Sequence, residues 1–152
     1  MFERSKRGEN ALLIQPRTAP ARAGADEERL EEFTELARSA GANVVANLTA
    51  RVDRPKAAYY LGSGKVEEAR QLCEVHGADL VLVNHALSPI QVRNLERALG
   101  RRVIDRTDLI LDIFALRARS HEGKLQVELA QLKHIAARMV RGWTHLERQR
   151  GG

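Results

Sequence analysis

Cysteine and long apolar runs are what this sequence most clearly lacks. Cys73 is the only cysteine in 152 residues, which excludes an intrachain disulfide and a cysteine-rich zinc site and suits a reducing cytosol. No apolar run approaches the roughly 18 residues that a membrane-spanning helix needs. The first ten residues are charged and contain no apolar core of a secretion signal. We therefore predict a cytoplasmic protein without a membrane span, with peripheral attachment to a membrane left open.

Metal-binding and catalytic patterns are also scarce. The five histidines are scattered, and none forms the two-histidine helical pair typical of zinc sites. Cys73 and His76 lie one helical turn apart, but a packed cysteine beside a surface histidine is favoured over a catalytic pair. Asp105, Asp108 and Asp112 could bind a hard cation, although such a set near a helix start more often caps the helix and pairs with arginines. We predict no catalytic residue, metal or cofactor within this chain.

Positive charge gathers at the C-terminal end of the chain. Residues 1–100 contain 14 Lys+Arg and 14 Asp+Glu, whereas residues 101–152 contain 11 and 6 and so supply the whole net charge of +5. A neutral body joined to a basic end favours an anionic partner, with nucleic acid the first candidate. The alternative is a merely solvated helix face, because Lys and Arg are good helix formers.

Short apolar runs alternate with amphipathic segments along most of the chain. This rhythm predicts an α/β fold with a small, open, mostly parallel sheet and flanking helices. The uninterrupted run Asp79–Val83 is typical of a strand buried on both faces. We expect an α/β domain at 1–104, a connecting helix at 105–119 and a long helix at 120–152. The expected strands are 11–15, 43–52, 79–83 and 102–104; the expected helices begin near Asp26, after Gly64, at Ser88 and at Asp105 or Thr107.

A glycine-rich turn invites comparison with a phosphate loop. The pattern G-x-x-x-x-G-K-[ST] fails at Tyr59, where a glycine is required, and at Val66, where a hydroxyl is required. A tight turn that opens a helix is therefore the favoured interpretation, with Ser63 or Gly64 as N-cap and Glu67 in the first turn. A weak anion site is left open for the backbone amides and the lysine of Gly62, Ser63, Gly64 and Lys65.

The last stretch carries a heptad seam. Its apolar residues recur at alternating steps of four and three: Leu125, Leu129, Leu132, Ala136, Met139, Trp143 and Leu146. Such a seam predicts a long helix that packs against a partner helix of similar length, and the glycine pair behind it predicts a turn. We expect either a piece of a longer protein that ends at the tip of an antiparallel helical arm, or a chain that pairs with its own copy.

The outer side of this helix is the best candidate binding surface. Arg and Lys neutralise phosphates, and a projecting rod reaches grooves that a compact domain cannot enter. The predicted RNA-binding residues are Lys133, Arg138, Arg141, Arg148, Arg150, Gly151 and Gly152.

Several segments of this chain resemble the N-terminal part of the HflX family of translational GTPases. The resemblance covers most of residues 58–152 and departs at Asp108, where glycine is common, and at Leu116, where glutamine is common. It rests on Tyr60–Lys65, Leu87–Glu96, Val103–Thr107, Leu109–Ala115, Glu122–Gln131 and Trp143–Gly152.

The resemblance implies an α/β domain, a two-helix arm with a glycine-rich tip and then a GTPase domain. It implies binding to the large ribosomal subunit and its rRNA, and separation of ribosomal subunits under stress. The second arm helix and the GTPase domain, with its GTP and Mg²⁺, would lie outside this sequence. Two alternatives remain: a stand-alone module that dimerises through the seam, and a small nucleotide-binding protein that uses Lys65.

Overall fold

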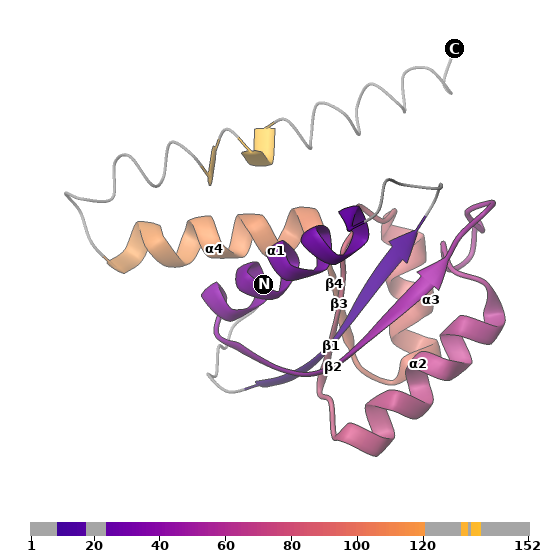
Figure 1. Ribbon diagram of the computed structural model, residues 1–152. Coiled ribbons are helices and arrows are strands. Elements are labelled where there is room, and N and C mark those ends of the chain that lie inside the picture. The colour runs from indigo at the N-terminus through magenta and orange to yellow at the C-terminus, as the bar shows by residue number, and fades with distance from the viewer. Residues whose placement is uncertain (1–8, 18–23, 121–131, 134, 138–152) are drawn as a thin grey trace, which may run out of the picture.

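The computed structural model describes residues 9–17, 24–120, 132–133 and 135–137. Strands and helices alternate along the chain, as expected for an α/β protein (Figure 1). The elements are β1 (Glu9–Arg17), α1 (Ala25–Ser39), β2 (Ala42–Arg51), α2 (Ser63–His76), β3 (Leu80–Val83), α3 (Pro89–Leu99), β4 (Arg102–Asp105) and α4 (Arg106–Ser120).

The four strands form one parallel sheet in the order β2-β1-β3-β4. This confirms the predicted parallel sheet. β1 is central and pairs with β2 on one side and with β3 on the other, where Ile14 lies opposite Val83. β3 is buried along its whole length, which explains its uninterrupted apolar sequence, because a central parallel strand is covered on both faces.

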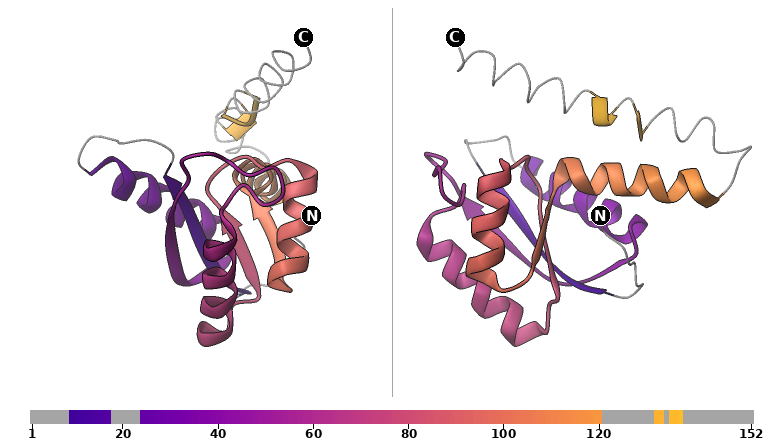
Figure 2. Two further views of the ribbon diagram at one scale, coloured as in Figure 1. Left: turned by 90° about the vertical axis from the view of Figure 1, so that its right-hand side faces the viewer. Right: turned by 180° about the vertical axis from the view of Figure 1, so that it is seen from behind.

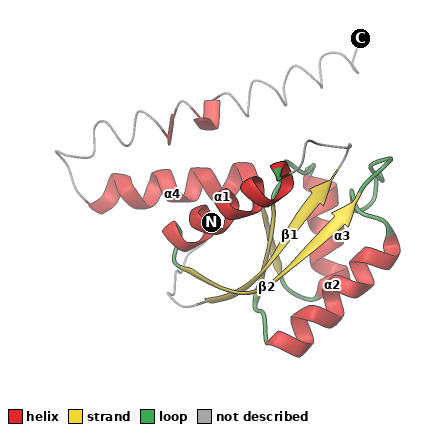
Figure 3. Ribbon diagram, viewed as in Figure 1, coloured by secondary structure: helices red, strands yellow, loops and turns green. Residues whose placement is uncertain are grey.

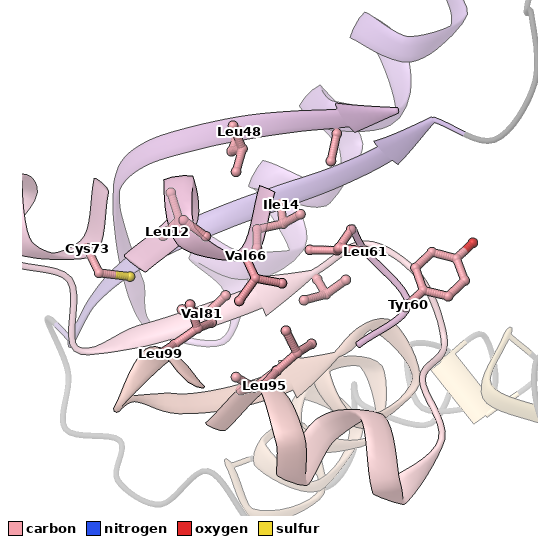
Figure 4. Close-up of a cluster of buried hydrophobic side chains, with 14 of the residues drawn as sticks. Leu12, Ile14, Leu48, Tyr60, Leu61, Val66, Cys73, Val81, Leu95 and Leu99 are labelled. Carbon is pink, nitrogen blue, oxygen red and sulfur yellow. The ribbon is translucent and has the colours of Figure 1, made fainter. Parts of the chain in front are cut away.

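Helices cover both faces of the sheet, as Figure 2 shows from two further sides. Residues of β1 and β3 alternate between two buried clusters because successive side chains of a strand point to opposite faces. Leu13 and Leu82 pack with Phe33 of α1 and Leu109 of α4 on one face. On the other face, the strands pack against α2 and α3 in a cluster that includes Leu12, Ile14, Val66, Cys73, Val81, Leu95 and Leu99 (Figure 4).

Local capping signals explain where the helices begin and end (Figure 3). At the start of α3 the Ser88 hydroxyl accepts a hydrogen bond from the Gln91 amide, and the Gln91 side chain accepts one from the Ser88 amide. This is the capping box that the sequence predicts. α2 and α3 both end at a glycine in the left-handed conformation, Gly77 and Gly100, which a residue with a Cβ adopts only with strain.

Five residues of the predicted long helix are described, and they lie over the α1/α4 face of the domain (Figure 1). Leu132 packs against the cluster that contains Phe33 and Leu109, and Ala136 is only 5% exposed. At Leu132 the α/β domain itself provides the apolar contacts. The other seam residues lie outside the described residues, so the predicted partner helix stays a prediction.

Candidate functional site

The sheet has a topological switch point between β1 and β3. From β1 the chain passes through α1 to β2 on one side, whereas from β3 it passes through α3 to β4 on the other. In open α/β sheets the crevice outside the carboxyl ends of such strands is the usual ligand site. The candidate site therefore consists of the side chains that gather at this edge.

A buried polar network spans the switch point. Gln15 near the end of β1 is 1% exposed and Asn84 after β3 is 6% exposed. The Asn84 side-chain amide donates to Gln15 Oε1 at 2.6 Å, and the Arg106 guanidinium donates to Asn84 Oδ1 at 2.7 Å. Arg106 also lies 3.7 Å from Glu32 of α1. Because these polar groups satisfy one another, the network cross-links two strands and two helices rather than presenting unused groups to a ligand.

Tyr60 and His85 stack beside this network. Their ring centroids are 4.5 Å apart. Tyr60 has a φ of 69°, the only positive φ of a non-glycine residue in the described part of the chain. Its backbone pairs with Lys56, because each residue's amide donates to the carbonyl of the other. Burial raises the pKa of the Tyr60 hydroxyl. The stack on His85 and the backbone pair with Lys56 hold the loop before α2 in place.

A cavity of about 470 Å³ lies next to the stack, between the loop after β3, helix α3 and the start of α4. Leu87, Pro89 and Val92 supply its apolar wall, and Arg93 lines it together with three carboxylates, those of Glu96, Asp105 and Asp108. The walls can hold an apolar group, and the excess of carboxylates gives the cavity no preference for an anion.

Asp105 lines this cavity, but its carboxylate is already hydrogen-bonded to backbone amides. Its carboxylate accepts hydrogen bonds from the amides of Leu87 at 2.8 Å and Asp108 at 2.9 Å. Burial raises its pKa, and the two amide bonds oppose that shift. Asp105 therefore caps α4 and anchors the loop after β3, as the structural interpretation of the aspartate set predicts. Among the described residues, no group of three or more His, Cys, Asp or Glu is arranged to hold a metal ion.

The glycine-rich turn opens a helix, as predicted, but its cap differs from the expectation. The N-cap is Gly62, without a side-chain cap, and the first turn of α2 contains no acidic residue. The predicted caps Ser63 and Gly64 are wrong because the helix begins one residue earlier than the side-chain pattern suggested. Lys65 pairs with Glu68 at 3.0 Å, so its charge is already partly compensated within α2.

Cys73 is fully buried in the cluster beneath α2, whereas His76 is exposed. Burial also raises the pKa of the Cys73 thiol, which lowers the population of the reactive thiolate. Cys73 is therefore a packing residue, in agreement with the favoured interpretation of the sequence.

The predicted arm surface is represented by Lys133, which is exposed. Arg138, Arg141, Arg148, Arg150, Gly151 and Gly152 lie outside the described residues. No helix among the described residues is long and apolar enough to cross a membrane.

A second basic surface, on the domain itself, was not predicted from the sequence. It consists of the loop 51–58 and the outer side of α3, where Arg54, Lys56, Arg93 and Arg97 are all exposed. The charge count did not reveal this surface, because residues 1–100 contain as many carboxylates as cations in total.

Comparisons with known proteins identify the family. A family model described as "GTP-binding GTPase N-terminal" matches residues 27–115, and one described as "GTP-binding GTPase Middle Region" matches residues 117–152. The GTPase HflX of Escherichia coli is 53% identical over the whole chain, and that of Caldanaerobacter subterraneus is 48% identical. The chain spans 35% of the length of each of these two relatives.

Solved structures agree on the fold. A mutation variant of SsGBP matches 82% of this chain and 38% of its own with a TM-score of 0.55 and 28% identity. The complex of SsGBP with GDP matches 94% of this chain and 45% of its own with a TM-score of 0.57, at 19% identity. From the family models and the relatives together, the chain belongs to the HflX family of GTPases and corresponds to its N-terminal and middle regions.

Proposed function

We propose that this chain is the ribosome-contacting N-terminal region of an HflX-type translational GTPase. The whole protein would bind the large ribosomal subunit and separate ribosomal subunits under stress. The observation that carries the proposal is the match of all 152 residues of this chain to proteins named GTPase HflX. The chain spans about a third of the length of these proteins. GTP and Mg²⁺ would bind to a GTPase domain beyond residue 152, and the protein would work in the cytoplasm.

The division of labour follows from the sequence of the described domain. Gly62–Lys65 does not fit the phosphate-loop pattern, and Lys65 is engaged with Glu68. Nucleotide hydrolysis is therefore not assigned to this domain. Residues 1–104 would form the α/β domain, 105–119 the connecting helix and 120–152 the first helix of an arm whose second helix lies in the rest of the protein.

The arm would contact RNA through its basic side. Lys133, Arg138, Arg141, Arg148 and Arg150 stand off the heptad seam, and Gly151–Gly152 would form the tip. Each cation that neutralises a phosphate releases a counterion, so binding to ribosomal RNA must weaken as salt rises. Lys133 is exposed while its neighbour Leu132 faces the domain, which supports a helix with an apolar inner side and a basic outer side.

The proposal is tested by measuring how tightly the whole protein, expressed from its complete gene, binds to purified large ribosomal subunits. The arm variant carries Arg148→Glu and Arg150→Glu. The control carries Arg29→Glu and Arg38→Glu on α1, which change the net charge equally but lie on an acidic helix. We expect salt-sensitive binding that the arm variant loses and the control keeps. Binding that ignores salt and survives the arm reversal contradicts the proposal.

A further inference from the structure

The α/β domain is neutral as a whole but its charges are separated between the two faces of the sheet. Helix α1 carries six carboxylates and two arginines. Across the sheet, the loop 51–58 and α3 carry five cations and two carboxylates: Arg51, Arg54, Lys56, Arg93 and Arg97 against Asp53 and Glu96. Because α1 and α3 lie on opposite faces, the acidic helix is kept apart from the basic loop and α3, so a polyanion is attracted to the loop and α3 rather than to α1. Helix α2, on the same face as α3, carries three carboxylates and two cations.

The loop and α3 form one continuous surface because hydrogen bonds join them. The Gln91 side chain donates to the Lys56 carbonyl at 2.9 Å, and the Asn94 side chain donates to the Ala58 carbonyl at 3.0 Å. The Lys56–Tyr60 backbone pair and the Tyr60–His85 stack hold the same loop from behind. Lys56 is therefore presented beside α3 by a braced backbone rather than by an unsupported loop.

On α3 the exposed side chains follow one stripe. Ile90, Arg93 and Arg97 recur at steps of three and four residues, the spacing of neighbours on one helix face. Arg93 and Arg97 are separated by about 6 Å along the helix axis. We call Lys56, Arg93 and Arg97, with Arg54 beside them in the loop, the α3 basic surface.

The four cationic side chains of the α3 basic surface form no ion pairs within the described part of the chain. The side chains of Arg54, Lys56, Arg93 and Arg97 make no ion pair or hydrogen bond with any residue that the structure describes. Cations elsewhere differ: Arg70 pairs with Glu67 and Glu74 of its own helix. The nearest carboxylate on α3, Glu96, accepts a hydrogen bond from the Val103 amide at 3.1 Å and is drawn toward β4.

The chemistry of this surface fits a nucleic-acid backbone better than a protein partner. Protein interfaces need buried aromatic or aliphatic anchors at their centre, and the only exposed large apolar side chain on α3 is Ile90. A row of arginines and a lysine without ion pairs among the described residues suits phosphates, which guanidinium groups bind in a bidentate manner; Arg93 also lines the cavity that contains Glu96, Asp105 and Asp108.

We infer that the α3 basic surface is a second contact for the phosphate backbone of RNA, separate from the arm. The inference rests on the proposed function, because it takes ribosomal RNA as the polyanion. It gives the protein two basic contacts on distinct elements: one on the helix predicted over residues 120–152 and one on the α/β domain. Two contacts of modest strength on one chain raise the combined affinity well above that of either alone.

The test compares three neutralising variants of the whole protein for binding to purified large subunits and to their protein-free rRNA. The first carries Lys56→Gln, Arg93→Gln and Arg97→Gln. The second, a charge-matched control, carries Arg70→Gln on α2 together with Arg29→Gln and Arg38→Gln on α1, all of which pair with carboxylates. The third carries Arg148→Gln and Arg150→Gln in the arm. Urea unfolding of each variant verifies that the exposed substitutions leave the domain folded.

For the α3 variant we expect affinity to fall at least about tenfold near physiological salt, and the slope of log K against log salt to become shallower by about one unit per cation removed. The charge-matched control keeps the wild-type slope. An α3 variant with wild-type affinity and slope, beside an arm variant that loses binding, overturns this inference and leaves the proposed function standing. An α3 variant that binds large subunits more weakly but binds protein-free rRNA with wild-type affinity also overturns it, because the contact would then be with a ribosomal protein. Absence of any salt-dependent binding by the wild type overturns both.

Discussion

Tyr60 offers a test in which two physical effects oppose each other. Its side chain is 6% exposed and stacked on His85, so truncation removes buried surface. Its φ of 69° is a conformation that costs a residue with a Cβ about 1–2 kcal/mol. Replacement by alanine therefore loses the ring and keeps the strain, whereas replacement by glycine loses the ring and relieves the strain.

The expected magnitudes follow from the burial. Tyr60→Ala should lower the free energy of unfolding by about 3–5 kcal/mol, as for other large buried aromatic residues. Tyr60→Gly should be about 1 kcal/mol more stable than Tyr60→Ala, the reverse of the order in helices and strands. Tyr60→Phe should stay within about 0.5 kcal/mol of the wild type, because the hydroxyl has no hydrogen-bond partner among the described residues and points away from the core (Figure 4).

Urea unfolding followed by far-ultraviolet circular dichroism measures these differences, with equal m-values as the condition for comparing midpoints. Tyr60→Phe serves as the control for the loss of the hydroxyl alone. A glycine variant that is less stable than the alanine variant would refute the argument, because it would mean that the loop gains nothing from a residue that tolerates positive φ.

Three further predictions concern the helix ends and the seam. Ser88→Ala should cost about 1 kcal/mol by removing the cap of α3, and Gln91→Ala should cost more in the same unfolding assay because it also loses the bond to the Lys56 carbonyl. The raised pKa of Asp105 means that its neutral form favours folding; this contribution is complete below the unfolded-state pKa of about 4 and is lost as pH rises through the folded-state pKa. The unfolding free energy of the wild type should therefore fall relative to Asp105→Asn across this pH range, and parallel pH profiles would count against it. Leu132→Asp should lower stability by about 1–3 kcal/mol without changing the sedimentation coefficient, whereas a dimer that dissociates on this substitution would support pairing between two copies.

The parallel sheet was predictable because its strongest signals are local. The sequence of Leu80–Val83 predicts a strand buried on both faces, and Ser88 with Gln91 predicts the start of α3. The N-cap of α2 was misplaced because Ser63 is a good capping residue by type, while the chain actually enters the helix at Gly62. Side-chain preference alone does not fix the backbone of the preceding turn.

The charge separation and the Tyr60 conformation depend on contacts that periodicity cannot supply. Residues 1–100 sum to zero charge, and only the strand order reveals that α1 and α3 lie on opposite faces of the sheet. Tyrosine rarely adopts a positive φ, so nothing in the sequence marks Tyr60 for it. The pairing with Lys56 and the stack with His85, a residue from the loop after β3, impose that backbone.

The central place of β1 has a consequence for synthesis on the ribosome. Of the four strands of this sheet, the first to emerge is the one that both β2 and β3 must flank, so the sheet cannot close until the Leu80–Val83 segment has left the exit tunnel. Until then the apolar run Ala11–Ile14 can pair only with β2. A translation start after Arg17 would remove β1, the strand that joins β2 to β3, so this sheet could not form.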